Sequence, residues 1–307
     1  MKILVTGGAG FIGSHIVNAY IDGGHDVIVI DNLSSGEMRL VNPKAKFYHL
    51  DIHSPEVKTI LEKEKITVIN HHAAQISVSA SVSNPLFDAN SNIIGTLQLL
   101  QNAVSLKIEK FIFASTGGAM YGEQKTFPAS EEQPCKPLSP YAISKLSAET
   151  YINYFGTQYG LNTTVLRYSN VYGPHQNPHG EAGVVAIFCE RLLKDQQPII
   201  NGDGEQTRDF VYVQDIVQAN IIALNPQCSG LFNVGTGKET SVNSLTRYLI
   251  KASAIAVSIE HGPAKKGEQK RSSIDSAKLL KGFGWKPSVS VEEGLLETFK
   301  YFKNKKT

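Results

Sequence analysis

The chain has 307 residues, of which 41% are apolar and 19% are charged, and its formal net charge is +2. These values are typical of a folded globular protein and argue against long disordered segments. Because the net charge is small and the densest lysine run lies in a polar tail at 300–306, we do not expect a nucleic-acid partner.

No run of residues is long and apolar enough to cross a bilayer, and no signal-peptide pattern follows Met1, so we expect a cytoplasmic protein without membrane contact. Cys135, Cys189 and Cys228 are widely spaced and odd in number, which favours reduced thiols over a disulfide framework. Cys-x-x-Cys and His-Glu-x-x-His spacings are missing from the sequence, so we predict no metal site.

Short apolar runs alternate with amphipathic segments over the first 170 residues. In chain order they predict a strand at 2–6, a helix at 11–22, strands at 26–30 and 46–50, a helix at 55–63, a strand at 67–70, a helix at 90–105, a strand at 110–115, a helix at 141–159 and a strand at 163–168. The helices provide the crossovers that parallel strands need. The pattern therefore predicts a Rossmann-type α/β fold with a doubly wound parallel sheet.

Beyond Asn170 the alternation is lost, and 174–183 has the composition of a loop that leaves the sheet. We predict a dinucleotide-binding domain over 1–170, to which segments around 205–236 return. Residues 171–307 would then form mainly a smaller α/β domain that binds the substrate.

A glycine-rich segment, 6–13, lies between the first predicted strand and the first predicted helix. There the glycines allow a tight turn and a close approach of the backbone to a pyrophosphate, whose charge meets the amide groups of the helix N-terminus. Asp31 ends the second strand 18 residues after Gly13, where a carboxylate can accept hydrogen bonds from the adenosine ribose hydroxyls. Because it would repel a 2′-phosphate, the cofactor is predicted to be NAD and not NADP.

Tyr141 and Lys145 are spaced so that both side chains face one side of a helix. An ammonium group beside a phenol favours the phenolate, which makes the tyrosine a usable base near neutral pH. The spacing alone is not diagnostic, because it recurs after Tyr121 and Tyr301. However, only Tyr141 both opens a predicted helix and follows a strand that ends in Ser115-Thr116, as a Ser/Thr, Tyr, Lys triad requires.

Together these motifs resemble those of the extended short-chain dehydrogenases/reductases of the NAD-dependent epimerase/dehydratase family, and within it those of UDP-glucose 4-epimerases. The resemblance covers essentially the whole chain. The matching segments are 6–13, 31–32, 51–52, 72–75, Asn92 with 95–96, 115–116, 121–122, Tyr141 with Lys145, 167–174 and 208–211.

The resemblance implies NAD-dependent epimerisation at C4 of a UDP-hexose through a 4-keto sugar, with Tyr141, Lys145, Thr116 and Ser115 as catalytic residues. It implies a homodimer formed through the helices at 90–105 and 141–159. The cofactor contacts it implies are Gly7, Gly10, Phe11, Ile12, Gly13, Asp31, Asn32, Ser35, Gly36, Asp51, Ile52, His72, Ala73, Ala74, Gln75, Asn92, Ser115, Tyr141, Lys145 and Tyr168. The substrate contacts are Thr116, Tyr141, Asn170, Val184, Arg208, Lys265, Arg271 and Ser272.

Two positions depart from the family pattern. Gly117 lies where the family usually has the hydroxyl that assists the tyrosine, so Thr116 or Ser115 must supply that hydrogen bond. Lys265 replaces an arginine that would clamp a phosphate. Because lysine lacks the guanidinium fork, we expect Arg271 to carry more of the phosphate contact.

Sister activities remain open on the same scaffold. A nucleotide-sugar 4,6-dehydratase would need an acid just after the Ser/Thr, whereas residues 117–120 are Gly-Gly-Ala-Met. A UDP-glucuronate decarboxylase and a non-catalytic NAD-binding regulator are two further possibilities. The regulator is disfavoured because both Tyr141 and Lys145 are present. A small residue at Ser272, beside the C2 substituent of the sugar, would also leave room for N-acetylated hexoses.

Overall fold

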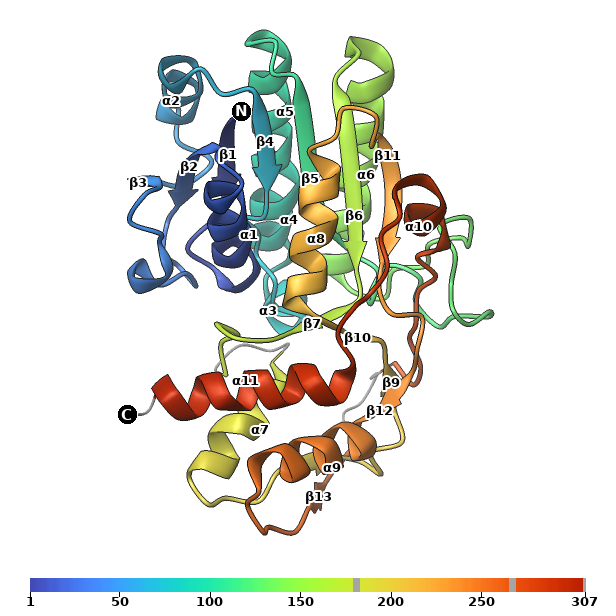
Figure 1. Ribbon diagram of the computed structural model, residues 1–307. Coiled ribbons are helices and arrows are strands. Elements are labelled where there is room, and N and C mark those ends of the chain that lie inside the picture. Colours follow the sequence, from blue (N-terminus) through green and yellow to red (C-terminus); the bar gives the residue numbers. More distant parts are fainter. Residues whose placement is uncertain (179–182, 265–268, 306–307) are drawn as a thin grey trace.

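The computed structural model describes residues 1–178, 183–264 and 269–305. Its main feature is a parallel seven-stranded sheet in the order β3-β2-β1-β4-β5-β6-β11 (Figure 1). The strands are β1 (Lys2–Thr6), β2 (Asp26–Asp31), β3 (Lys46–His49), β4 (Val68–His71), β5 (Lys110–Thr116), β6 (Asn162–Tyr168) and β11 (Gly230–Val234). The strand order reverses between β1 and β4, which confirms the predicted doubly wound Rossmann-type fold.

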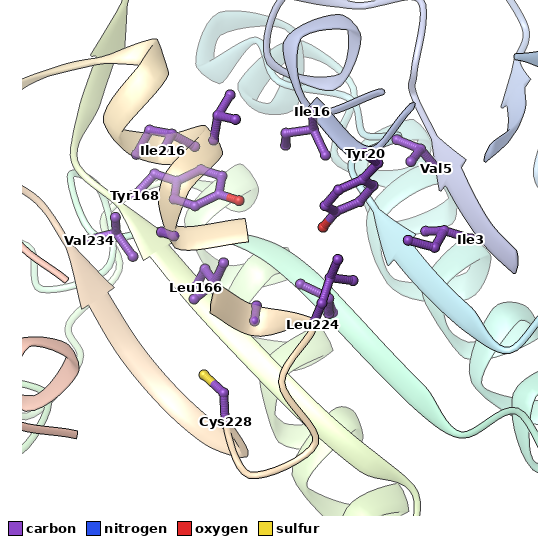
Figure 2. Close-up of a cluster of buried hydrophobic side chains, with 14 of the residues drawn as sticks. Ile3, Val5, Ile16, Tyr20, Leu166, Tyr168, Ile216, Leu224, Cys228 and Val234 are labelled. Atoms are coloured by element: carbon purple, nitrogen blue, oxygen red, sulfur yellow. The ribbon is translucent and has the colours of Figure 1, made fainter. Parts of the chain in front are cut away.

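Helices cover both faces of this sheet. On one face, α1 (Phe11–Asp22) and α8 (Val213–Ala223) pack on β1 and β6, and Figure 2 shows Ile16 and Ile216 pointing into this buried cluster. On the other face lie α2 (Glu56–Glu64), α5 (Gly95–Ser105) and α6 (Pro140–Tyr159). Each large apolar side chain buried in these layers contributes about 1.5–3 kcal/mol, and the two layers fix the carboxyl edge of the sheet.

The helix predicted at 90–105 begins earlier than expected. Helix α4 (Pro85–Ala89) leads through a π-helical turn, η2 (Asn90–Ile94), into α5. The side chain of Asn84 caps α4 by accepting a hydrogen bond from the Phe87 amide at 3.1 Å, and a proline follows it. This Asn-Pro start signal was missed because the first apolar residues of α4, Leu86 and Phe87, are exposed and break the expected periodicity.

The remaining elements lie mostly beyond the carboxyl edge of the sheet. They are η1 (Met38–Leu40), α3 (Val78–Ser83), β7 (Asn170–Tyr172), α7 (Val184–Leu193), β8 (Ile199–Asn201), β9 (Thr207–Arg208), β10 (Phe210–Tyr212), β12 (Thr240–Ser241), α9 (Val242–Ser253), β13 (Glu260–Gly262), α10 (Ala277–Phe283) and α11 (Val291–Lys305). Helices α7, α9 and α11 share a separate apolar cluster and face the ends of the strands (Figure 1). The domain limits stay a prediction.

Within the described ranges, none of the helices has the length and apolarity that crossing a membrane would require.

Candidate active site

The predicted cofactor and catalytic residues gather along one edge of the sheet, because they follow the carboxyl ends of neighbouring parallel strands. Thr6 pairs in register with His71, and Thr116 pairs with Tyr168. In open α/β sheets a crevice outside the strand ends, at the point where the strand order reverses, is the usual ligand site. Here that point lies between β1 and β4.

The glycine loop enters α1 through a turn that only glycine allows at two positions. Gly7 has a positive φ of 71°, and a Cβ atom on Gly13 would lie 2.1 Å from the Gly7 carbonyl oxygen. Helix α1 starts after Gly10, so no capping side chain fills the space in front of its first amide groups. The loop therefore fits the pyrophosphate of a dinucleotide.

Asp31 is almost fully buried at the end of β2 and already accepts two backbone hydrogen bonds. Its carboxylate accepts from the Ala9 amide at 2.9 Å and from the Leu33 amide at 2.8 Å. A carboxylate has further lone pairs for ribose hydroxyls, so Asp31 both shapes the glycine loop and fits the predicted contact. Nearby, Asn32 donates to Asp51 at 2.7 Å.

The end of β4 is joined to β1 and β6 by polar contacts. The Thr6 hydroxyl lies 2.7 Å from His71 Nδ1 and accepts from the Ala73 amide. His72 Nε2 lies 3.1 Å from the Tyr168 hydroxyl, and burial together with the charge of Lys145 lowers the pKa of His72 to about 3. His72 is therefore neutral at working pH, and it holds the phenol of Tyr168 in place.

Tyr141 and Lys145 lie on the first turns of α6, which the Ser139 side chain caps by accepting from the Ala142 amide. Burial raises the pKa of Tyr141, and the Asp88 carboxylate raises it further. Burial lowers the pKa of Lys145 to about 8, and its ammonium group donates to the Ala114 carbonyl at 3.0 Å. The phenol thus needs a further positive charge nearby before it becomes a strong base.

Ser115 and Thr116 differ in what they contact. The Ser115 hydroxyl donates to Glu149 at 2.5 Å, and Glu149 is paired in turn with Arg167. The hydrogen bond that the Thr116 hydroxyl accepts from the Ala119 amide is long, at 3.3 Å. The Thr116 hydroxyl is thus less committed to other contacts than that of Ser115, and its role in assisting Tyr141 stays a prediction.

Gly118 lies close to both Asn170 and Ser272, which are two of the predicted substrate contacts. Asn170 Oδ1 is buried and has no hydrogen-bond partner among the described residues. It lies 3.2 Å from where a Cβ atom on Gly118 would be, and the Ser272 hydroxyl lies 3.5 Å from the Gly118 carbonyl oxygen. An unsatisfied buried amide oxygen is costly, so Asn170 is suited to accept a hydrogen bond from a ligand.

The cationic residues predicted for the diphosphate are spread over three segments. Arg208 ends β9 and donates to the Thr207 carbonyl at 2.8 Å. Arg271 is paired with Glu239 at 2.5 Å and stacks over the Phe127 ring. Val184 is the first residue of α7, and Lys265 falls outside the described residues. These phosphate contacts stay predictions.

Sequence reasoning missed two buried acids that belong to this site. Glu149 follows Lys145 by one helical turn, a spacing that could have flagged it. Asp88 lies in α4, ahead of the helix start predicted at residue 90, so its placement opposite α6 was not foreseen.

Comparison with known proteins identifies close relatives over the whole chain. A family model described as "NAD dependent epimerase/dehydratase family" matches residues 3–235. A relative from Methanocaldococcus jannaschii named "Putative UDP-glucose 4-epimerase" is 45% identical over 302 residues, covering 98% of both chains. Among solved structures, a Thermotoga maritima UDP-glucose 4-epimerase with UDP-glucose matches with a TM-score of 0.97 and 47% identity over 100% of both chains. A Thermus thermophilus UDP-glucose 4-epimerase in complex with NAD matches at 0.94 and 41%, over 99% of both chains.

Proposed function

Because this chain belongs to the NAD-dependent epimerase/dehydratase family, we propose that it interconverts UDP-glucose and UDP-galactose by inverting C4. The predicted family, cofactor and enzyme class, a UDP-sugar 4-epimerase, are confirmed by the comparisons. The observation in the structure that carries the proposal is the Tyr141 and Lys145 pair on α6, placed at the carboxyl edge of the sheet beside a segment without acids.

In the proposed mechanism Tyr141 removes the proton from the C4 hydroxyl. NAD would be held by the glycine loop and Asp31, and it would supply the hydride acceptor and donor that inversion at C4 needs. The sugar, now a 4-ketone, turns over in the site, and Tyr141 returns the proton after hydride is delivered to the opposite face. Lys145 favours the phenolate through its charge, and Thr116 supports the phenol by a hydrogen bond. Asn170 and Arg208 hold the nucleotide end of the substrate, which fixes C4 in position.

Packing around Gly117 argues against a dehydratase. A Cβ atom at Gly117 would lie 2.5 Å from Cδ1 of the buried Ile274, so a larger residue at this position would require the Ile274 side chain to move. A Cβ atom at Gly118 would lie 3.2 Å from Asn170 Oδ1, which is a tight but milder contact. Residues 117–120, Gly-Gly-Ala-Met, include no acid. The protein therefore lacks, at this point of the site, the acid that would protonate a leaving hydroxyl at C6.

A panel of substrates tests the function directly. Purified protein with NAD is incubated with UDP-galactose, UDP-glucose and UDP-glucuronate, and the products are separated by chromatography. We expect a single equilibrium mixture of UDP-glucose and UDP-galactose from either side. Formation of a 4-keto-6-deoxy sugar would favour a dehydratase. Release of carbon dioxide from UDP-glucuronate would favour a decarboxylase, and bound NAD without turnover of any substrate would favour a regulator.

We further propose that N-acetylated UDP-hexoses are accepted. The support is the small Ser272 side chain beside the Gly118 carbonyl, where an aromatic residue would fill the space for an acetamido group. UDP-N-acetylglucosamine should therefore turn over with the wild-type protein but not with Ser272→Tyr, which should keep UDP-glucose. Equal loss of turnover of both substrates would show that other residues determine the specificity.

A cytoplasmic location stays a prediction.

A further inference from the structure

A buried carboxylate that the mechanism above does not use lies beside the catalytic helix. Asp88 of α4 is fully buried, and one of its oxygens accepts from the Ser144 hydroxyl at 2.6 Å. Ser144 directly precedes Lys145 on α6. The other Asp88 oxygen accepts from the side-chain amides of Gln75 at 2.7 Å and Asn92 at 3.0 Å. Three helical or loop segments thus converge on one carboxylate.

Backbone contacts fix the orientation of both amides. Asn92 Oδ1 accepts from the Gln75 backbone amide at 3.0 Å, while its NH2 group donates to the Gln75 carbonyl at 2.9 Å. The Gln75 side chain likewise accepts from the Ser77 amide and donates to the Ser77 carbonyl. Because neither amide can be turned round without losing these bonds, both must present N–H groups to Asp88. One carboxylate oxygen of Asp88 therefore accepts two hydrogen bonds from amide groups whose orientation is fixed.

The partners of Asp88 are neutral, which distinguishes it from the other acid near Lys145. Glu149 forms a two-pronged ion pair with Arg167, so its charge is compensated. His71 and His72 also face Lys145, but burial lowers the pKa of each well below its usual range, so both are uncharged. Asp88 therefore supplies negative charge to the Tyr141 and Lys145 pair that no partner cation cancels within the described structure.

We propose that Asp88 is a positioning residue of this active site, which ties α6 to Gln75 and Asn92 through Ser144 and whose negative charge acts on Tyr141 and Lys145. The inference rests on the proposed function. It assigns to the first turn of α4 a role in setting the pH range of the enzyme.

The negative charge of Asp88 acts to raise the pKa of both Tyr141 and Lys145. A carboxylate nearby disfavours a phenolate, so it raises the pKa of Tyr141, and it favours an ammonium, so it opposes the lowering of the Lys145 pKa by burial. Removing the charge should lower both pKa values. Turnover needs Tyr141 deprotonated and Lys145 protonated, so the two limbs of the kcat/KM profile report these two groups, and both limbs should then move to lower pH.

Asp88→Asn is the variant of choice because its oxygen can still accept from the two amides while its NH2 group donates to Ser144. We expect both limbs of the kcat/KM profile for UDP-galactose to shift downward by roughly one pH unit, the size typical of a single nearby charge. Ser144→Ala keeps the charge of Asp88 but removes its hydrogen bond to α6. Its kcat should therefore fall about tenfold or more, while the limbs of its kcat/KM profile stay at the pH of the wild type. Glu56→Gln, a change at an exposed acid on α2, should leave the profile as in the wild type.

The outcomes separate this inference from the proposed function. A wild-type protein that does not turn over UDP-galactose contradicts the function itself. An Asp88→Asn protein that is folded, binds NAD and is active, but whose limbs coincide with those of the wild type, overturns the role of Asp88 alone. If Asp88→Asn does not fold, Ser144→Ala decides the positioning role: an unchanged kcat would overturn it.

Discussion

Tyr141 is the residue on which the chemistry depends most directly. The change Tyr141→Phe removes only the oxygen that transfers the proton, so the protein should fold and bind NAD as before. We expect kcat to fall by roughly 10²–10⁴-fold, the contribution typical of a general acid–base group. Initial rates with UDP-galactose, together with the NAD content of the purified protein, measure this. Turnover close to that of the wild type would contradict the proposed role of Tyr141.

Ser115 and Thr116 are neighbours, yet their contacts predict different outcomes on removal. Thr116→Val should reduce kcat strongly with little loss of stability, because the hydroxyl makes only a long bond in the structure. Ser115→Ala leaves the buried Glu149 without one donor, so it should cost about 1–3 kcal/mol of stability and less activity. Denaturant unfolding and steady-state kinetics on both variants separate the two effects. The reverse order of activity losses would assign the assisting hydroxyl to Ser115.

At the level of elements, one buried ion pair joins the catalytic helix to the sheet. Arg167 of β6 and Glu149 of α6 approach to 2.6 Å with side chains that are 4% and 5% exposed, and Arg167 also donates to the Tyr121 hydroxyl. Breaking a buried pair from one side leaves an uncompensated charge. Arg167→Met should therefore destabilise the protein by about 3–5 kcal/mol.

The control is Lys300→Ala, which breaks an exposed pair with Glu297 on α11 and should cost at most about 1 kcal/mol. Equilibrium unfolding in urea measures both variants. Similar midpoints for Arg167→Met and the wild type would show that the pair is not needed to hold α6 on the sheet.

The strands β1 to β6 and the helices α1, α2 and α6 could be predicted from the sequence, because short apolar runs alternate with longer segments that have start or end signals, such as Ser139-Pro140 before α6. Strand β11 was foreseen only as part of a segment around 205–236 that returns to the first domain. The start of α4 could not be predicted, since Leu86 and Phe87 are exposed in the chain and therefore do not follow the core-facing pattern. The short strands and helices after residue 170 were also not predicted individually. Their apolar residues serve a local cluster formed by α7, α9 and α11, which no single segment reveals.

The residues of the candidate site likewise divide into those that the sequence predicts and those that it does not. Asp31, the last residue of β2, was located by counting from the glycine loop, whereas Tyr168, the last residue of β6, was assigned from the family resemblance. The buried acids Asp88 and Glu149 were not, because their importance depends on what lies opposite them in space. A sequence gives the spacing along one helix, whereas a contact such as Ser144 to Asp88 spans 56 residues.

For the whole molecule, the helices that pack behind the sheet leave an apolar surface in contact with solvent. On the helical stretch from α4 to α5, Phe87 and Ile94 are 53% and 44% exposed, and on α6, Ile143 and Tyr154 are both 50% exposed. The spacing of eleven residues places Ile143 and Tyr154 on one side of α6. Such a patch marks an association surface, which supports the predicted homodimer.

We therefore expect the protein to be a dimer in which α5 and α6 of one copy pack on the same helices of the other, since a two-fold axis brings identical patches together. Charge placed in this surface would be desolvated on association, so Phe87→Glu combined with Tyr154→Glu should give a monomer. Leu280→Glu, a change at a similarly exposed leucine on α10, should leave the dimer intact. Sedimentation velocity at micromolar concentration measures all three proteins against the chain mass of 33.5 kDa. A monomeric wild type, or a double variant that remains dimeric, would place the interface elsewhere or remove it.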